Sequence, residues 1–145
     1  MKEETLKHLR KDFGLHPVTV GEPVPEEEIT ALEQDAGFPL PDDYKEFVRE
    51  FGGGIVGPFS IYGLRAADAM GDDEASAMDV TNQFRADGWE EVENWLVFSS
   101  DHAGNPIGID RNGKIWINNH DTGSIENIAD NFEDYLRINC LSLKQ

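Results

Sequence analysis

The sequence has one cysteine, few cationic residues and no long apolar run. Cys140 stands alone among 145 residues, so the chain forms no internal disulfide, which favours the reducing cytosol. No stretch approaches the roughly 20 apolar residues that cross a bilayer, and the charged start MKEETLKHLRKDF lacks the apolar core of a signal peptide. We therefore expect a cytoplasmic protein that does not enter a membrane.

Cations are scarce relative to acids. Lys and Arg number 12 against 29 Asp and Glu, which gives a formal net charge of −17. Such a chain repels phosphate backbones and anionic lipid, so we expect neither nucleic acid nor a membrane surface as a partner. The charge either keeps the protein soluble or steers it toward a basic partner, and composition alone favours solubility.

Recognisable catalytic and metal-binding patterns are also missing. Asp101, His102, Asp110, His120 and Asp121 have side chains that serve in metal sites and acid–base catalysis. Their spacing matches no zinc motif, HExxH is absent, and Asp and His are ordinary turn residues. We therefore expect these residues to shape turns.

Two further features fail as chemical sites. Gly52–Gly54 follows an expected helix instead of preceding one, and no Lys-Ser/Thr pair follows it, so it is no phosphate loop. Cys140 falls on the inner face of an expected helix, where it packs as a small apolar group. We expect no catalysis, no cofactor and no functional metal.

The strongest structural signal lies in residues 37–54, GFPLPDDYKEFVREFGGG. Tyr44, Phe47, Val48 and Phe51 recur at helical spacing and form one apolar stripe. Two prolines keep the entry extended, acids occupy the first turn, and three glycines end the helix. This pattern predicts a buried helix that builds the core.

The remaining pattern predicts helices, then an antiparallel meander, then a helix, which is the order of an α+β domain. Further helices are expected over Glu3–Phe13 (capped by Gly14), Glu26–Ala36 and Ala77–Asp87, and after the cap residue Asn131. Strands are expected over Pro58–Leu64, Trp95–Ser99 (a buried central strand), Pro106–Asp110, Lys114–Asn118 and Ser124–Ala129, with a hairpin turn at Asn112–Gly113. The length suits a single domain over residues 1–145.

The stretch from Arg65 to Glu93 is acidic and poorly patterned. Trp89 within it is either a lid on the core or an interface anchor, and burial is the more common role of a large aromatic. The candidate partner-binding residues are Asp72, Asp73, Glu74, Asp79, Asp87, Trp89, Glu90, Glu91 and Glu93.

Several segments carry a family resemblance in a fixed order. They are GFPLPDDYKEFVREFGGG (37–54), WLVFSS (95–100), NPIGID (105–110), GKIW (113–116) and IENIADNFEDYL (125–136). Together they resemble the SMI1/KNR4 family of the SUKH superfamily. The resemblance implies an α+β domain with one central, mostly antiparallel sheet and helices packed around it.

The resemblance also implies a binding role. Bacterial SUKH proteins are taken to be immunity proteins that neutralise toxins, often nucleases, and fungal relatives regulate cell-wall synthesis through protein contacts. Our first hypothesis is an immunity protein whose partner is a toxin with a basic surface, because a nuclease is positive where it holds phosphates. The alternatives are a non-catalytic regulatory interaction module and a small metal-binding hydrolase that uses His102 and His120.

Overall fold

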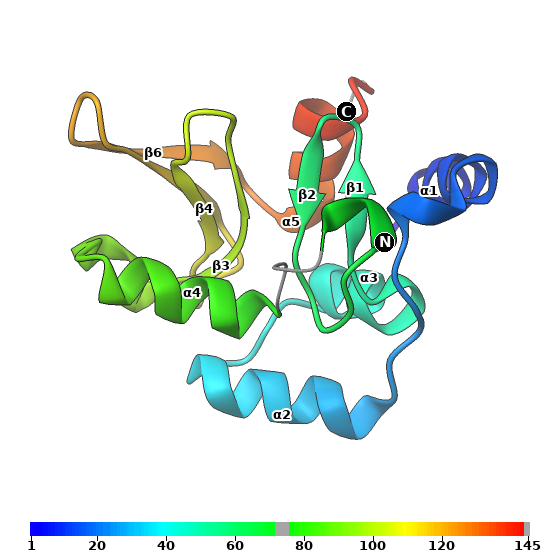
Figure 1. The fold of residues 1–145 in the computed structure, drawn as a ribbon, viewed down its shortest axis with the longest axis horizontal. Helices are drawn as coiled ribbons and strands as arrows, with labels where there is room; N and C mark the ends of the chain where they lie inside the picture. The colour runs from blue at the N-terminus through cyan, green and yellow to red at the C-terminus, as the bar shows by residue number, and fades with distance from the viewer. Residues whose placement is uncertain (72–75, 144–145) are drawn as a thin grey trace.

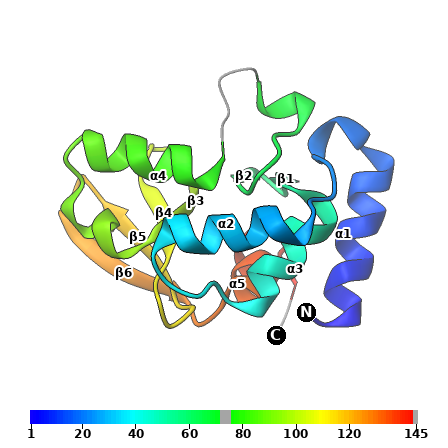
Figure 2. The same ribbon diagram turned by 90° about the horizontal axis from the view of Figure 1, so that it is seen from below.

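The computed structural model describes residues 1–71 and 76–143 (Figures 1 and 2). Its helices are α1 (Glu3–Leu15), α2 (Glu26–Ala36), α3 (Asp42–Phe51), α4 (Ala77–Ala86) and α5 (Phe132–Asp134), with α5 continued by the π-helical segment η4 (Tyr135–Cys140). Short 3₁₀ turns are η1 (Pro17–Thr19), η2 (Asp68–Met70) and η3 (Glu90–Asn94). The strands are β1 (Gly54–Val56), β2 (Phe59–Ile61), β3 (Leu96–Ser100), β4 (Pro106–Ile109), β5 (Ile115–Asn119) and β6 (Ser124–Ala129).

The strands form two antiparallel sheets, so the expected α+β class is confirmed. Strands β3-β4-β5-β6 form one sheet in sequence order, and β1-β2 form a small hairpin. In Figure 1 this hairpin stands between the four-stranded sheet and α1. The amide of Tyr62 donates to the carbonyl of Phe98 at 2.7 Å and links the hairpin end to β3.

The expectation that Trp95–Ser99 forms a central strand is wrong in position. The strand begins at Leu96 and lies at the end of the sheet order. It is buried nonetheless, because α4 covers it and β2 lies beside it: the Ser99 hydroxyl donates to the carbonyl of Ser60 at 2.7 Å. A continuous apolar run indicates that both faces of a strand are buried. It does not indicate whether the strand lies at the centre or at the end of the sheet.

Helix α3 builds the main core as its stripe predicts. Tyr44, Phe47, Val48 and Phe51 are all buried, and Phe132 from α5 lies among their rings. The Phe132 ring centroid is 5.1 Å from that of Tyr44 and 5.5 Å from that of Phe47, in edge-on contacts. The N- and C-terminal halves of the chain therefore share one core.

Most predicted helix ends are confirmed. Gly37 ends α2 in the left-handed conformation (φ 84°), and the Asn131 side chain accepts a hydrogen bond from the amide of Asp134 at 2.7 Å. Gly14 does not cap α1, because the helix continues through Gly14 to Leu15 and its C-cap residue is His16. The glycine stop after α3 also starts a strand that the pattern did not predict, since Gly54 opens β1.

Helix α1 is held against the C-terminal helical segment. Arg137, only 4% exposed, donates to the Thr5 hydroxyl at 2.9 Å, and that hydroxyl donates to Glu133 at 2.7 Å. Leu9 and Phe13 complete the contact with the core. Within residues 1–71 and 76–143, no helix is both long and apolar enough to cross a membrane.

Candidate functional site: an acidic pocket on the tryptophan face

All three tryptophans of the chain gather on one face of the four-stranded sheet. Trp95 is buried with Val92 and Val97, and Trp89 and Trp116 pack against them while staying partly exposed. We call Trp89, Trp95 and Trp116 the tryptophan face. It is a second, smaller apolar cluster, separate from the main core.

A glycine in β4 makes room for this cluster. Gly108 lies opposite Val97 on one side and Trp116 on the other. A Cβ at this position would lie 2.8 Å from the Cβ of Trp95, closer than side chains pack. The missing side chain therefore lets Trp95 lie directly over the strand.

Two side chains of α4 position the segment that follows it. The buried Thr81 hydroxyl accepts from the amide of Val97 at 2.8 Å and so fixes α4 on β3. The Arg85 guanidinium donates to the carbonyls of Glu93 and Trp95 at 3.3 and 3.2 Å. Arg85 thereby braces the turn η3, which directly follows Trp89.

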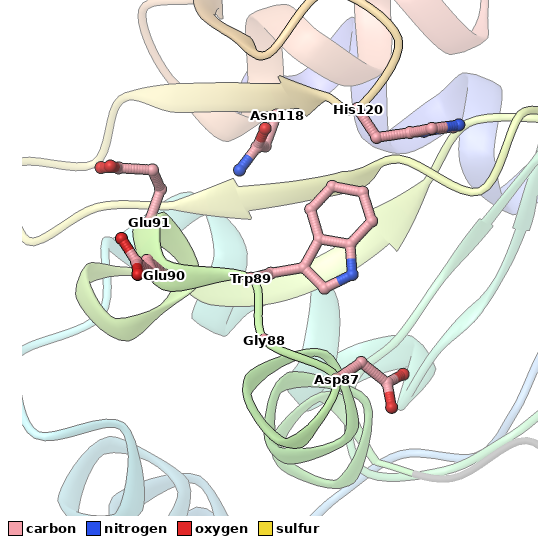
Figure 3. A pocket seen from close by; sticks show the side chains of 7 residues that line it. All are labelled: Asp87, Gly88, Trp89, Glu90, Glu91, Asn118 and His120. Carbon is pink, nitrogen blue, oxygen red and sulfur yellow. The ribbon is translucent and has the colours of Figure 1, made fainter.

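A pocket of about 370 Å³ opens beside Trp89 (Figure 3). It is lined by Asp87, Gly88, Trp89, Glu90, Glu91, Asn118 and His120. In this view Asn118 of β5 and His120 of the turn after it lie on one side of the Trp89 indole, Asp87 lies on the other, and Glu90 and Glu91 extend away from the ring. The indole makes edge-on contacts with the rings of Phe84 and His120, whose centroids lie 5.6 and 5.9 Å from its own. These contacts hold the indole in place.

The pocket is lined by acidic side chains. Glu90 and Glu91 are exposed, and within the described part of the chain neither carboxylate has a hydrogen bond or ion pair. Among the residues that the structure describes, the Asp87 carboxylate accepts only from the neutral Gln83 side-chain amide, at 3.1 Å. No lysine or arginine is among the lining residues. Three carboxylates and one indole thus line the pocket, and no Lys or Arg of the described residues lines it with them.

A second pocket continues the tryptophan face and shares Glu91 with the first. Its lining residues are Glu91, Asn94, Trp95, Asp110, Arg111, Trp116 and Ile125. Here the polar groups are already matched, because the Trp116 indole N–H donates to Asp110 at 2.9 Å and Arg111 supplies a cation. Ile125, 37% exposed, adds an apolar wall from β6.

Comparison with protein families gives one match that spans most of the chain. The model of the SMI1 / KNR4 family (SUKH-1) matches residues 23–138. The chain belongs to the SMI1/KNR4 family. SUKH domains are known as a toxin-immunity type and are generally non-catalytic. A search of curated proteins gave no match.

The matched range of this SMI1/KNR4 domain contains the whole tryptophan face and both pockets. Helix α1 precedes the match, although its Leu9 and Phe13 belong to the main core. The features that distinguish the acidic pocket are therefore set into the family fold and do not depend on an added segment.

The structure brings together only part of the predicted partner-binding set. Asp87, Trp89, Glu90 and Glu91 line one pocket. Glu93 lies on the same turn, but its carboxylate Oε2 forms an ion pair with Nε of Arg85 at 3.8 Å. Asp72, Asp73 and Glu74 lie outside the described residues.

Asp79 lies apart from the pocket at the other end of α4. Its carboxylate accepts from the Ser76 amide and hydroxyl at 3.3 and 3.1 Å in an N-terminal capping box. Eight residues of helix separate it from Asp87, or about 12 Å at the usual rise. Its first role is therefore to begin the helix.

Sequence reasoning missed the wall that β5 and β6 supply. Asn118, Trp116 and Ile125 were not proposed as site residues, yet strand alternation places Trp116 and Asn118 on one face. The alternation of Ile115, Trp116 and Ile117 was visible in the sequence. What the sequence did not show is that α4 and η3 pack on that same face.

The histidine and carboxylate cluster is built into turns. Asp101 accepts from the backbone amides of Ala103 and Asn105 at 3.0 and 2.9 Å. Desolvation by burial opposes ionisation, but these bonds and one from the Asn105 side chain hold the pKa of Asp101 below its usual value. Asp110 is occupied in the same way by the amides of Asn112 and Lys114.

The two histidines of the hydrolase alternative are engaged separately. His102 stacks on Phe59, with ring centroids 5.2 Å apart, while His120 contacts Asn105 and Asp121. Over residues 1–71 and 76–143, no group of three His, Cys, Asp or Glu side chains could hold a metal ion. Burial raises the pKa of the Cys140 thiol to about 12, so this cysteine is a poor nucleophile.

Proposed function

We propose that this protein is a cytoplasmic immunity protein that binds and neutralises a cognate toxin domain with a basic surface. The observation that carries the proposal is an aromatic pocket with uncompensated carboxylates, set in a domain of the SMI1/KNR4 family. The net charge of −17 supports a basic surface on the partner.

The pocket has the composition of a binding surface. Interfaces place aromatic residues at their centre and polar residues at the rim, and tryptophan is over-represented among residues that dominate binding energy. Trp89 supplies such a centre, and Glu90 and Glu91 supply the rim. Rim carboxylates act mainly by speeding association with a basic partner and by rejecting acidic ones.

Neutralisation requires no chemistry from this chain. A nuclease presents a cationic surface to its phosphate substrate, and an acidic protein that covers this surface excludes the substrate. The candidate contact residues are Asp87, Trp89, Glu90 and Glu91, with Asn118 and His120 on the facing wall. The partner is a protein, and neither nucleic acid nor a cofactor takes part.

The test is co-expression with the toxin domain encoded beside this protein's gene. Cells that express the wild-type protein should survive, and cells that express Trp89→Ala should die while the variant keeps its melting temperature. Ile138→Ala is the matched control, because Ile138 is an exposed apolar side chain (45%) and lies on the C-terminal segment η4. It should protect like the wild type.

Two outcomes would contradict the proposal. If cells die despite the wild-type protein and the purified pair does not associate, the immunity role is wrong. If the pair binds tightly and the toxin stays active, the protein is a regulatory interaction module.

A further inference from the structure

We propose that the Trp89 pocket binds the side chain of one arginine of the partner protein. The occupant is thus a guanidinium group, held by the indole and by the carboxylates of Glu90, Glu91 and Asp87. The inference rests on the proposed function only for the identity of the partner protein that carries the arginine. The pocket's own chemistry selects the group.

The indole provides an aromatic wall that is already held in position. Trp89 is partly exposed inside the pocket, and its perpendicular contacts with Phe84 and His120 hold the ring in place (Figure 3). Arg85 braces the following turn through backbone carbonyls. A cation over a tryptophan ring is attracted by the ring quadrupole, most strongly among the aromatic residues.

The charge around the ring decides the class of occupant. The three carboxylates have no cationic partner within residues 1–71 and 76–143, because the Arg85 guanidinium is turned to the carbonyls of η3 and to Glu93. An apolar guest would desolvate these carboxylates without replacing their hydrogen bonds, and an anionic guest would be repelled. A cationic guest supplies the missing charge.

The arrangement favours arginine over lysine. A guanidinium is planar, so it stacks on the indole while its N–H groups donate in the ring plane to more than one acceptor. Glu90 and Glu91 are successive residues at the same edge of the pocket, so two carboxylates are available there as acceptors. A lysine ammonium is a compact, strongly hydrated charge and gains less from a flat ring.

The neighbouring pocket provides an internal contrast. Trp116 also lines a hollow, but its indole N–H is bonded to Asp110 and Arg111 lines the same hollow. Arg111 repels a second cation there. The pocket beside Trp116 should therefore not bind the ligand that the Trp89 pocket binds.

The experiment follows the three indole N–H signals of the ¹⁵N-labelled full-length chain by NMR. Each signal is assigned by substituting one tryptophan with phenylalanine. The probes are N-acetylarginine amide, N-acetyllysine amide and N-acetylglutamine amide. The Trp89 signal should move saturably with the arginine probe, less with lysine and not with glutamine, while the Trp116 signal stays in place.

Charge-neutral variants locate the site. Glu90→Gln combined with Glu91→Gln should weaken binding of the arginine probe about tenfold, since two charge-assisted hydrogen bonds lose their charge. The matched control is Glu27→Gln combined with Asp35→Asn, which removes the same charge from exposed positions on α2. It should change the dissociation constant less than about twofold.

Each contrary result has a definite meaning. No saturable shift of the Trp89 signal, or equal shifts with the glutamine probe, would overturn the site. Equal affinity for the lysine probe would overturn the choice of guanidinium. Toxin protection that persists without probe binding would refute the arginine pocket alone, and probe binding without protection would refute the immunity role alone.

Discussion

Phe47 shows at the residue scale how the α3 stripe builds the core. It is 0% exposed, and its ring lies 5.3 Å from that of Phe51 and 5.5 Å from that of Phe132. These contacts link α3 to α5 through one side chain. This packing was predictable from residues 37–54, because helical spacing is a local property of the sequence.

We predict that Phe47→Ala lowers the free energy of unfolding by about 3–5 kcal/mol, since the ring leaves a cavity that its neighbours fill only in part. Chemical denaturation measures the change. Leu15→Ala is the control, because Leu15 is 64% exposed at the end of α1, and it should cost less than about 0.5 kcal/mol. A melting temperature for Phe47→Ala within a degree or two of wild type would show that α3 does not face the core.

The position of Trp89 was not predictable at this scale. Its contacts are Phe84, five residues earlier, and His120, which arrives from the far end of β5. The second contact depends on sheet topology, which a single sequence does not display. The sequence alone gave a choice between core lid and interface anchor, and the structure shows a partly buried side chain that borders a pocket.

Helix α4 and strand β3 form the element pair that supports the tryptophan face. Thr81 joins them: its hydroxyl accepts from the Val97 amide at 2.8 Å and donates to the carbonyl of Ala77 at 2.7 Å. Because β3 ends the four-stranded sheet, this side chain gives the Val97 amide an acceptor outside the sheet. The contact joins residues sixteen apart, which no local pattern reveals.

We predict that Thr81→Val destabilises the protein by about 1–3 kcal/mol, because the buried Val97 amide loses its acceptor while the side-chain shape is kept. Hydrogen exchange of the Val97 amide should accelerate in this variant. Thr81→Ser keeps the hydroxyl and should protect that amide as the wild type does. Unchanged exchange in Thr81→Val would mean that the hydroxyl does not hold the edge.

Elements with strong local signals were predicted nearly to the residue, and those set by tertiary contact were not. β6 was expected over Ser124–Ala129 and occupies that range, and α2 ends at Gly37 as expected. β1 went unpredicted because it has three residues, which pair with β2 and, through Gly54, with Val20. Short strands have little pattern of their own.

At the scale of the whole molecule, the fold buries one cysteine thiol and two tyrosine hydroxyls, and their burial opposes the loss of their protons. Burial raises the pKa of Cys140 to about 12 and raises the pKa of Tyr44 and Tyr135 above the usual phenol value. In the unfolded chain the thiol ionises near 8.5 and the phenols near 10. The folded state thus binds more protons than the unfolded state at high pH, so stability falls as pH rises through these values.

We predict that the melting temperature declines above about pH 8.5 and more steeply above about pH 10. Cys140→Ala should remove the first part of this decline, which amounts to about 1.4 kcal/mol per pH unit for one group. Scanning calorimetry of both proteins from pH 7 to pH 11 checks this. Parallel curves for the two proteins would show that the thiol ionises freely in the fold.

The candidate site belongs to the whole molecule, because its walls come from α4, η3 and β5. The sequence identified Asp87, Trp89, Glu90 and Glu91 from charge and from the missing family pattern. It also included Asp79, which serves as a helix cap. Charge density along a chain does not reveal which carboxylates already have partners, and that information comes only from the fold.

The most direct measurement is the rate at which the toxin domain associates with this protein as salt is raised, followed by stopped-flow fluorescence. Wild-type association should slow steeply between about 50 mM and 500 mM salt, because exposed charges are screened. Glu90→Gln with Glu91→Gln should associate about tenfold more slowly at low salt, whereas Glu27→Gln with Asp35→Asn should match the wild type. An association rate that does not change with salt, and that is the same for the wild type and the Glu90/Glu91 variant, would contradict the assignment of the acidic pocket as the binding surface.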